Sequence, residues 1–208
     1  MRVRRVEIGL VIVFAAVFVW SAIKPRDVMT WCLELAPIVV LWIVLIATYR
    51  KFPFTTLTYV WICAASVIVA VGGHYTYEFN PLFGWLRDQF GWQRNYYDRF
   101  GHFVKGLVAA LIARELLVRK SPVGDAHEGW LVFLTLNLVL STAAVYELLE
   151  FAVAKLTGTR AEEFLATQGD EWDSQWDMLM ALLGAVLAML VFRKWQDRQM
   201  LRLPVQTK

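Results

Sequence analysis

Carboxylate and histidine side chains recur at helical spacing inside otherwise apolar stretches of this 208-residue sequence. The pairs read Asp-x₃-His, Glu-x₂-Glu and Asp-x₃-Asp, and residues three or four apart share one face of a helix. Each pair would therefore present two ligands in one direction. Imidazole combined with carboxylates suits Zn, Mn or Fe, so we predict that these groups bind a divalent metal as a cofactor or share protons among themselves. The predicted metal ligands are His74, Asp98, His102, Glu147, Glu150, Asp173 and Asp177.

The same residue types also support three other interpretations. Asp98, His102 and Glu147 are candidate catalytic residues, because a carboxylate and an imidazole can act as a general acid and base on an outer-leaflet, lipid-linked or cell-envelope substrate. A proton- or ion-coupled transporter would use these groups for coupling. A structural interpretation makes carboxylates at helix starts N-caps, which suits Asp98 but leaves Glu147 and Glu150 unexplained.

The elements that must position these residues are transmembrane helices. Hydrophobic residues make up 58% of the chain, above the average of about 45–50% for soluble domains, and they cluster in long blocks. We predict an all-α, polytopic bundle of about six spans in a single domain covering residues 1–208, and no cleavage signal follows the first apolar run. The predicted spans are 6–23, 31–48, 56–75, 101–118, 130–155 and 176–193.

The distribution of Lys and Arg predicts that both termini are cytoplasmic. Alternate segments are rich in basic residues, and the positive-inside rule places such segments in the cytoplasm. Every loop then alternates correctly, with Arg160 among the few basic residues of the outer loops. The predicted location is therefore the inner membrane, with multiple passes. The basic residues of the cytoplasmic segments are Arg2, Arg4, Arg5, Arg50, Lys51, Arg119, Lys120, Arg193, Lys194, Arg198 and Arg202.

With this topology, the candidate ligands gather in the outward half of the bundle. Small residues follow the carboxylates on the same helical faces, which indicates sides where membrane helices approach closely. An ionised group in the hydrocarbon costs at least about 2.5–3.5 kcal/mol, so such groups are usually paired and functional. Glu34 could join this cluster or face the interface, Arg94 and Arg99 could neutralise an anionic head group, and Arg114 and Glu115 are expected to snorkel.

Composition excludes some partners. The net charge is only +3, so no nucleic acid is expected, and the lipid bilayer is the expected partner. The fourth span is the weakest, since Lys105 interrupts it, and a re-entrant helix is the alternative. The sequence leaves the oligomeric state, the substrate and the identity of the metal open.

Three motifs carry a family resemblance. Tyr-Asp-Arg-Phe-Gly-His-Phe at 97–103, Tyr-Glu-Leu-Leu-Glu at 146–150 and Thr-Gln-Gly-Asp-Glu-Trp-Asp-Ser-Gln-Trp-Asp-Met at 167–178 closely resemble the bacterial YjdF-type family of predicted inner-membrane proteins. The similarity extends from the first span to the sixth. The resemblance implies the architecture and the choice of residues, and it implies no reaction.

A looser resemblance is to VanZ-like membrane proteins, which are associated with glycopeptide tolerance and the cell envelope. Those proteins also combine an Asp-x₃-His helix start, a Glu-bearing helix and a late Asp before a small-residue helix. The matching positions are Asp98 with His102, Glu147 with Glu150, and Asp177. This chain is longer at its N-terminus and differs in the acidic loop before Asp177, so an envelope role is an analogy.

Overall fold

The computed structural model describes residues 5–125, 127–157 and 166–203, and this part of the chain contains helices and no strand. The predicted signals at Arg2, Arg4 and Arg160 lie outside the described residues. The long helices overlap the six predicted segments. The elements are α1 (Arg5–Ser21), α2 (Val28–Thr48), α3 (Thr56–Tyr75), η1 (Tyr77–Phe79), α4 (Pro81–Phe90), α5 (Tyr97–Lys120), η2 (Pro122–Asp125), α6 (Glu128–Thr157), α8 (Asp173–Leu187), the π-helical η4 (Ala188–Phe192) and α9 (Arg193–Met200).

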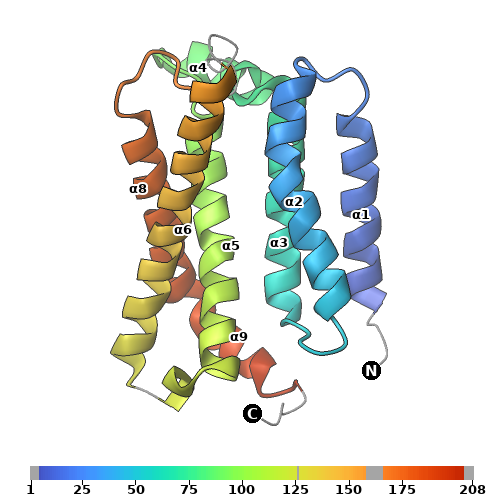
Figure 1. Cartoon of the computed structure of the whole chain (residues 1–208), viewed down its shortest axis with the longest axis vertical. Helices are drawn as coiled ribbons and strands as arrows, with labels where there is room; N and C mark the ends of the chain where they lie inside the picture. The colour runs from blue at the N-terminus through green and yellow to red at the C-terminus, as the bar shows by residue number, and fades with distance from the viewer. Residues whose placement is uncertain (1–4, 126, 158–165, 204–208) are drawn as a thin grey trace.

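The long helices form two groups that stand side by side (Figure 1). Helices α1, α2 and α3 make one group, and α5, α6 and α8 make the other, with α3 packed against α5 between them. Helix α1 begins and α9 ends at the same end of the bundle, whereas the short helix α4 lies across the opposite end. That opposite end corresponds to the side predicted to face outward.

Local signals in the sequence explain where several helices begin. Asp27 caps α2 by accepting a hydrogen bond from the Thr30 amide at 2.6 Å. Asn80 caps α4 in the same way, and Pro81 follows at the first helical position, where its missing N–H costs nothing. Gly91 ends α4 with a φ of +64°, a conformation that glycine adopts without strain.

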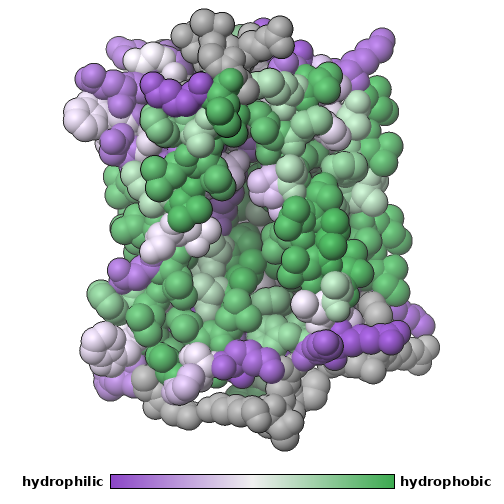
Figure 2. Space-filling view, viewed as in Figure 1, coloured by the Kyte–Doolittle hydropathy of each residue, from purple (hydrophilic) through white to green (hydrophobic). Residues whose placement is uncertain are grey.

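The surface is divided as a membrane protein requires. Figure 2 shows a band of hydrophobic side chains around the middle of the visible face, with hydrophilic side chains gathered at both ends. Four helical segments in the described residues are long and apolar enough to cross a membrane: Val28–Thr48, Thr56–Tyr75, Glu128–Leu156 and Asp173–Met200. Helix α5 is an uninterrupted helix of 24 residues that carries charged residues near both ends and Lys105 between them.

Helices α5 and α8 approach each other more closely than side chains normally allow. A Cβ atom on Gly106 would collide with the backbone carbonyl of Ala181, and one on Gly184 would collide with the carbonyl of Phe103. Small residues at a helix crossing let two backbones come together without hydrophobic side chains between them. This crossing lies directly below the candidate ligands and sets the position of α8 relative to α5.

The end of the bundle opposite α4 holds a buried polar network, so the expectation that Arg114 and Glu115 snorkel is wrong. Glu115 is fully buried and accepts hydrogen bonds from the Thr55 amide at 2.9 Å and from the Thr58 hydroxyl at 3.0 Å. Arg114 donates to Gln196 at 3.1 Å. Snorkelling requires free solvent, whereas here α9 folds back over these groups and satisfies them within the protein.

Candidate functional site

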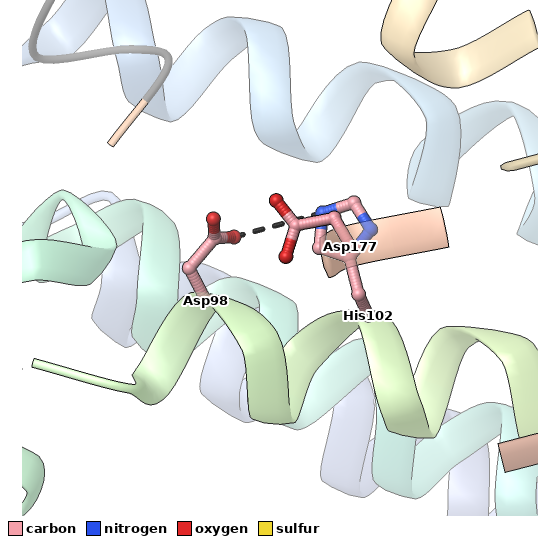
Figure 3. A group of neighbouring side chains, drawn as sticks. All are labelled: Asp98, His102 and Asp177. Atoms are coloured by element: carbon pink, nitrogen blue, oxygen red, sulfur yellow. Dashed lines mark ion pairs between the residues drawn. The ribbon is translucent and has the colours of Figure 1, made fainter. Parts of the chain in front are cut away.

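Two neighbouring helices bring Asp98, His102 and Asp177 together. Asp98 and His102 lie one turn apart on α5, and Asp177 faces them from the first turns of α8 (Figure 3). One ligand atom from each residue lies within 4.8 Å of the other two. All three side chains are buried, and the Asp98 Oδ1 atom lies 3.6 Å from His102 Nε2. The spacing on α5 follows from the helical repeat, whereas Asp177 depends on the close crossing with α8.

Glu147 of α6 adds a fourth group to this cluster. Its Oε1 atom lies 3.8 Å from His102 Nδ1, so the imidazole ring has a carboxylate near each of its nitrogens. Glu147 is buried, and the side chain of Ser174 hydrogen-bonds to it. We call Asp98, His102, Glu147 and Asp177 the carboxylate–histidine cluster.

Two oxygen atoms of the carboxylate–histidine cluster have no hydrogen-bond partner. They are Oε1 of Glu147 and Oδ1 of Asp177, and both are buried. A buried polar group is almost always hydrogen-bonded, so an unpaired carboxylate oxygen calls for an explanation such as an ion or a water molecule. Asp177 also belongs to the group of three close ligand atoms with Asp98 and His102, which is a donor set that suits a divalent cation.

Asp173 is buried but is neutralised by arginine. Its Oδ1 atom accepts a hydrogen bond from Arg94 Nη1 at 2.6 Å. Asp170 pairs with Arg99, and the backbone N–H of Trp172 together with Arg99 holds the pKa of Asp170 below its usual range. Arg94 and Arg99 therefore bind carboxylates of the same chain, rather than the head group considered from the sequence. This ion-pair layer lies on the outward side of the carboxylate–histidine cluster.

The Gln-Gly-Asp run holds that layer in place. The Gln168 side chain makes two hydrogen bonds to the backbone of Asn95, one to its N–H and one to its carbonyl, each at 2.9 Å. Arg94 donates to the Ala166 carbonyl at 3.2 Å, and Asn95 donates to the Asn80 carbonyl at 3.0 Å. The segment before α8 is thus tied to the segment before α5.

A second polar group surrounds Lys105, about one turn further along α5 than His102. Its Nζ atom lies 3.9 Å from Glu34 Oε2, and Glu34 also accepts hydrogen bonds from Tyr77 at 2.9 Å and from Tyr146 at 3.3 Å. Glu34 is buried, so it faces the bundle interior and not the interface. Burial and the nearby Glu34 carboxylate raise the pKa of Tyr77 well above its usual value, so its phenol stays a hydrogen-bond donor.

Two of the predicted ligands lie apart from the carboxylate–histidine cluster. His74 donates a hydrogen bond from Nδ1 to the Ser21 carbonyl at 3.0 Å and packs against Trp20, where α1 and α3 end. Glu150 is half-buried and interacts electrostatically with Lys105 and Glu34. Tyr77 and Tyr146 each contact Glu34 and Lys105. Helical spacing did not predict these contacts, although both tyrosines lie near predicted ligands in the sequence.

Comparisons with known proteins agree with the resemblance of the motifs. Residues 6–198 match the family described as predicted membrane protein, DUF2238. The chain is 39% identical over 186 residues to inner membrane protein YjdF of Escherichia coli (strain K12), which covers 89% of this chain and 88% of that protein. No solved structure matches the chain. The all-helical fold and these matches indicate an integral protein of the inner membrane.

Proposed function

We propose that this chain, which belongs to the DUF2238 family of predicted membrane proteins, binds a divalent cation within the outer half of its helical bundle. The ligands are Asp98, His102 and Asp177, and Glu147 lies at the other nitrogen of the imidazole, where a carboxylate orients a metal-bound ring. The observation that carries this proposal is the buried group of these three ligands, in which Oδ1 of Asp177 has no hydrogen-bond partner. Carboxylates that are brought together without counter-charges repel each other, and a bound cation removes that repulsion.

The donor set favours a transition metal of the Zn, Mn or Fe class. One imidazole nitrogen and two carboxylates combine nitrogen and oxygen ligands, whereas Ca²⁺ and Mg²⁺ take oxygen ligands. The described cysteines do not contribute, because Cys32 is exposed and Cys63 hydrogen-bonds to the Leu10 carbonyl. Asp173 and His74 are not part of the proposed site, because Asp173 pairs with Arg94 and His74 hydrogen-bonds to the Ser21 carbonyl, and Glu150 is outside the group whose ligand atoms lie close together.

An enzyme that acts on a lipid-linked or cell-envelope substrate is the second candidate function. A cavity of about 80 Å³ adjoins the carboxylate–histidine cluster and shares His102 with it, so a reacting group has room beside the imidazole. His102, with a carboxylate near each nitrogen, would hold or move a proton there, and a bound cation would supply Lewis acidity. A transporter is less supported, because Leu107, Val108 and Leu111 fill the described interior between Lys105 and Glu115.

The topology that we propose has six crossings with both termini in the cytoplasm, in one integral membrane domain. The common end of α1 and α9 supports it, because an even number of crossings returns the chain to its starting side. Basic residues at that end, such as Arg50 and Arg198, agree with the positive-inside rule. Helix α5 of 24 residues would span about 36 Å at 1.5 Å per residue, which is enough to cross the hydrocarbon.

Elemental analysis of the purified protein tests the cation. We expect about one Zn, Mn or Fe ion per chain, as a single closed ligand set requires. His102→Ala and Asp177→Asn should lose the ion, and His74→Ala is the matched control that should retain it. A monodisperse elution profile would show that each variant is folded. Wild-type protein without stoichiometric metal after reloading would contradict the proposal and favour shared protons.

A further inference from the structure

The cavity beside His102 has a lining that differs from the carboxylate–histidine cluster. Its volume is about 80 Å³, and its walls come from α5, α6 and α8. The polar residues that line it are His102, Lys105, Thr142 and Tyr146, and no Asp or Glu lines it. Small and apolar residues complete the walls: Gly106, Ala109, Val139, Ala143 and Ala181. The cavity therefore offers basic and hydroxyl groups, which suit an anion.

The ammonium group of Lys105 has unpaired hydrogen-bond donors at this cavity. Its Nζ atom is buried and has no hydrogen-bond partner, although an ammonium group has three N–H donors. The nearest carboxylate oxygen, on Glu34, lies 3.9 Å away, which is too far for a hydrogen bond. The ammonium instead lies 4.6 Å from the centre of the Tyr146 ring. An oxygen atom in the cavity would give Lys105 the acceptor that it lacks.

The cavity is reached from the plane of the membrane. Thr142 is exposed on α6, and the side chains of Lys105, Ala109 and Tyr146 are partly exposed beside it. Figure 2 shows hydrophilic surface set into a furrow over α5, between α2 and α6, at the level of the hydrophobic band. Lys105 lies about 12 Å along α5 from Tyr97, at 1.5 Å per residue, so this opening faces hydrocarbon and not water.

We infer that this cavity binds the anionic head group of a membrane lipid, with the acyl chain lying in the furrow along α5 and α6. A ligand that enters from hydrocarbon must carry an apolar part, and the ammonium of Lys105 selects an anionic part. The cavity has room for a small anionic group such as a phosphate or a carboxylate. This inference rests on the proposed function only in that His102, which also lines the cavity, would place the head group beside the cation.

Photo-crosslinking in nanodiscs tests the inference. The probes are three lipids with a diazirine near the head-group end of one acyl chain: phosphatidic acid, a free fatty acid and diacylglycerol. We expect phosphatidic acid or the fatty acid to label the α6 segment around Thr142 more than diacylglycerol does, and the stronger of the two identifies the anion. Lys105→Met should lower that labelling roughly tenfold, as expected for loss of a hydrogen bond to a charged group.

Two neighbouring substitutions on α6 supply a matched control. Thr142→Leu fills the mouth of the cavity, whereas Ser141→Leu makes the same kind of change on an exposed residue that does not line it. We expect only Thr142→Leu to reduce labelling. The inference would be overturned if Lys105→Met and Thr142→Leu were labelled as strongly as Ser141→Leu. It would also be overturned if diacylglycerol labelled the wild type as strongly as the anionic probes do. Either result would indicate ordinary annular lipid.

The metal content of the same samples separates this inference from the proposed function. If Lys105→Met retains the metal but loses labelling, the result supports both the cation proposal and the lipid inference. Wild-type protein without metal but with anion-selective labelling would contradict the cation proposal and leave the lipid inference standing. Wild-type protein with metal but without selective labelling would contradict the lipid inference alone.

Discussion

At the scale of single residues, Arg94 and Asp173 form a buried ion pair next to the candidate site. Their side chains are 8% and 7% exposed, and Nη1 lies 2.6 Å from Oδ1. Removing one partner of such a pair leaves an uncompensated buried charge, which costs more than the pair itself contributes. The pair therefore determines both the stability of the outer end and the identity of the carboxylates that are free to bind a cation.

We expect Arg94→Met to lower the free energy of unfolding by about 3–5 kcal/mol, because Asp173 would stay buried without its partner. The double variant Arg94→Met/Asp173→Leu should recover part of this loss. Denaturant titration in detergent micelles measures both. Arg87→Met is the control, since the Arg87–Asp88 pair is exposed and should contribute only about 0–1 kcal/mol. A similar loss for Arg87→Met and Arg94→Met would contradict the assigned role of burial.

At the scale of elements, the crossing of α5 and α8 positions Asp177 opposite Asp98 and His102. The helices touch through backbone at Gly106 and Gly184, so any added side chain there must move one helix away from the other. A shift of this kind would also separate the ligand atoms, because they lie only a few turns above the contact. Stability and metal binding are therefore coupled at this crossing.

We expect Gly184→Ala to lower the free energy of unfolding by about 1–3 kcal/mol, as overpacking does, and to weaken metal binding in the same protein. Gly9→Ala provides the control, because a Cβ at Gly9 meets no atom within 4 Å and alanine favours a helix. Thermal unfolding and metal titration of both variants measure the two effects. If Gly184→Ala behaves like Gly9→Ala, the close crossing does not position the site.

At the scale of the whole molecule, polar contacts toward both ends join the halves of the bundle. Glu34 and Tyr77 contact Lys105 toward the end where α4 lies, and Thr55 and Thr58 contact Glu115 toward the opposite end. Apolar residues such as Ile62, Leu107 and Leu111 fill the core between these contacts. The contacts of Lys105 border the proposed site, whereas those of Glu115 close the opposite end.

The proposed topology predicts which loops a membrane-impermeant maleimide can reach. After replacement of Cys32 and Cys63 by alanine, we expect Asp88→Cys in α4 to be labelled in spheroplasts with sealed membranes. His127→Cys, before α6, should be labelled only after the membrane is permeabilised. Both positions are exposed, so accessibility within the protein does not separate them. Labelling of His127→Cys alone in sealed spheroplasts would reverse the proposed orientation.

The sequence by itself determined that the protein is a helical membrane protein and which residue types are candidates for its site. Long apolar blocks predict helices because hydrocarbon offers no hydrogen bonds to the backbone. Helical spacing predicts that Asp98 and His102 share a face because the repeat is a property of one helix. Both arguments are local, and the observed helices overlap the predicted segments.

Only the tertiary structure decided which charged residues meet. Periodicity does not determine how two helices are rotated or how far one is shifted along the other. The close crossing at Gly106 and Gly184 sets this for α5 and α8, and so brings Asp177 to His102, while the paired loops direct Asp173 to Arg94. The same long-range packing holds His74 at α1 and encloses Glu115 beneath α9, where a hydropathy pattern predicts a snorkelling side chain.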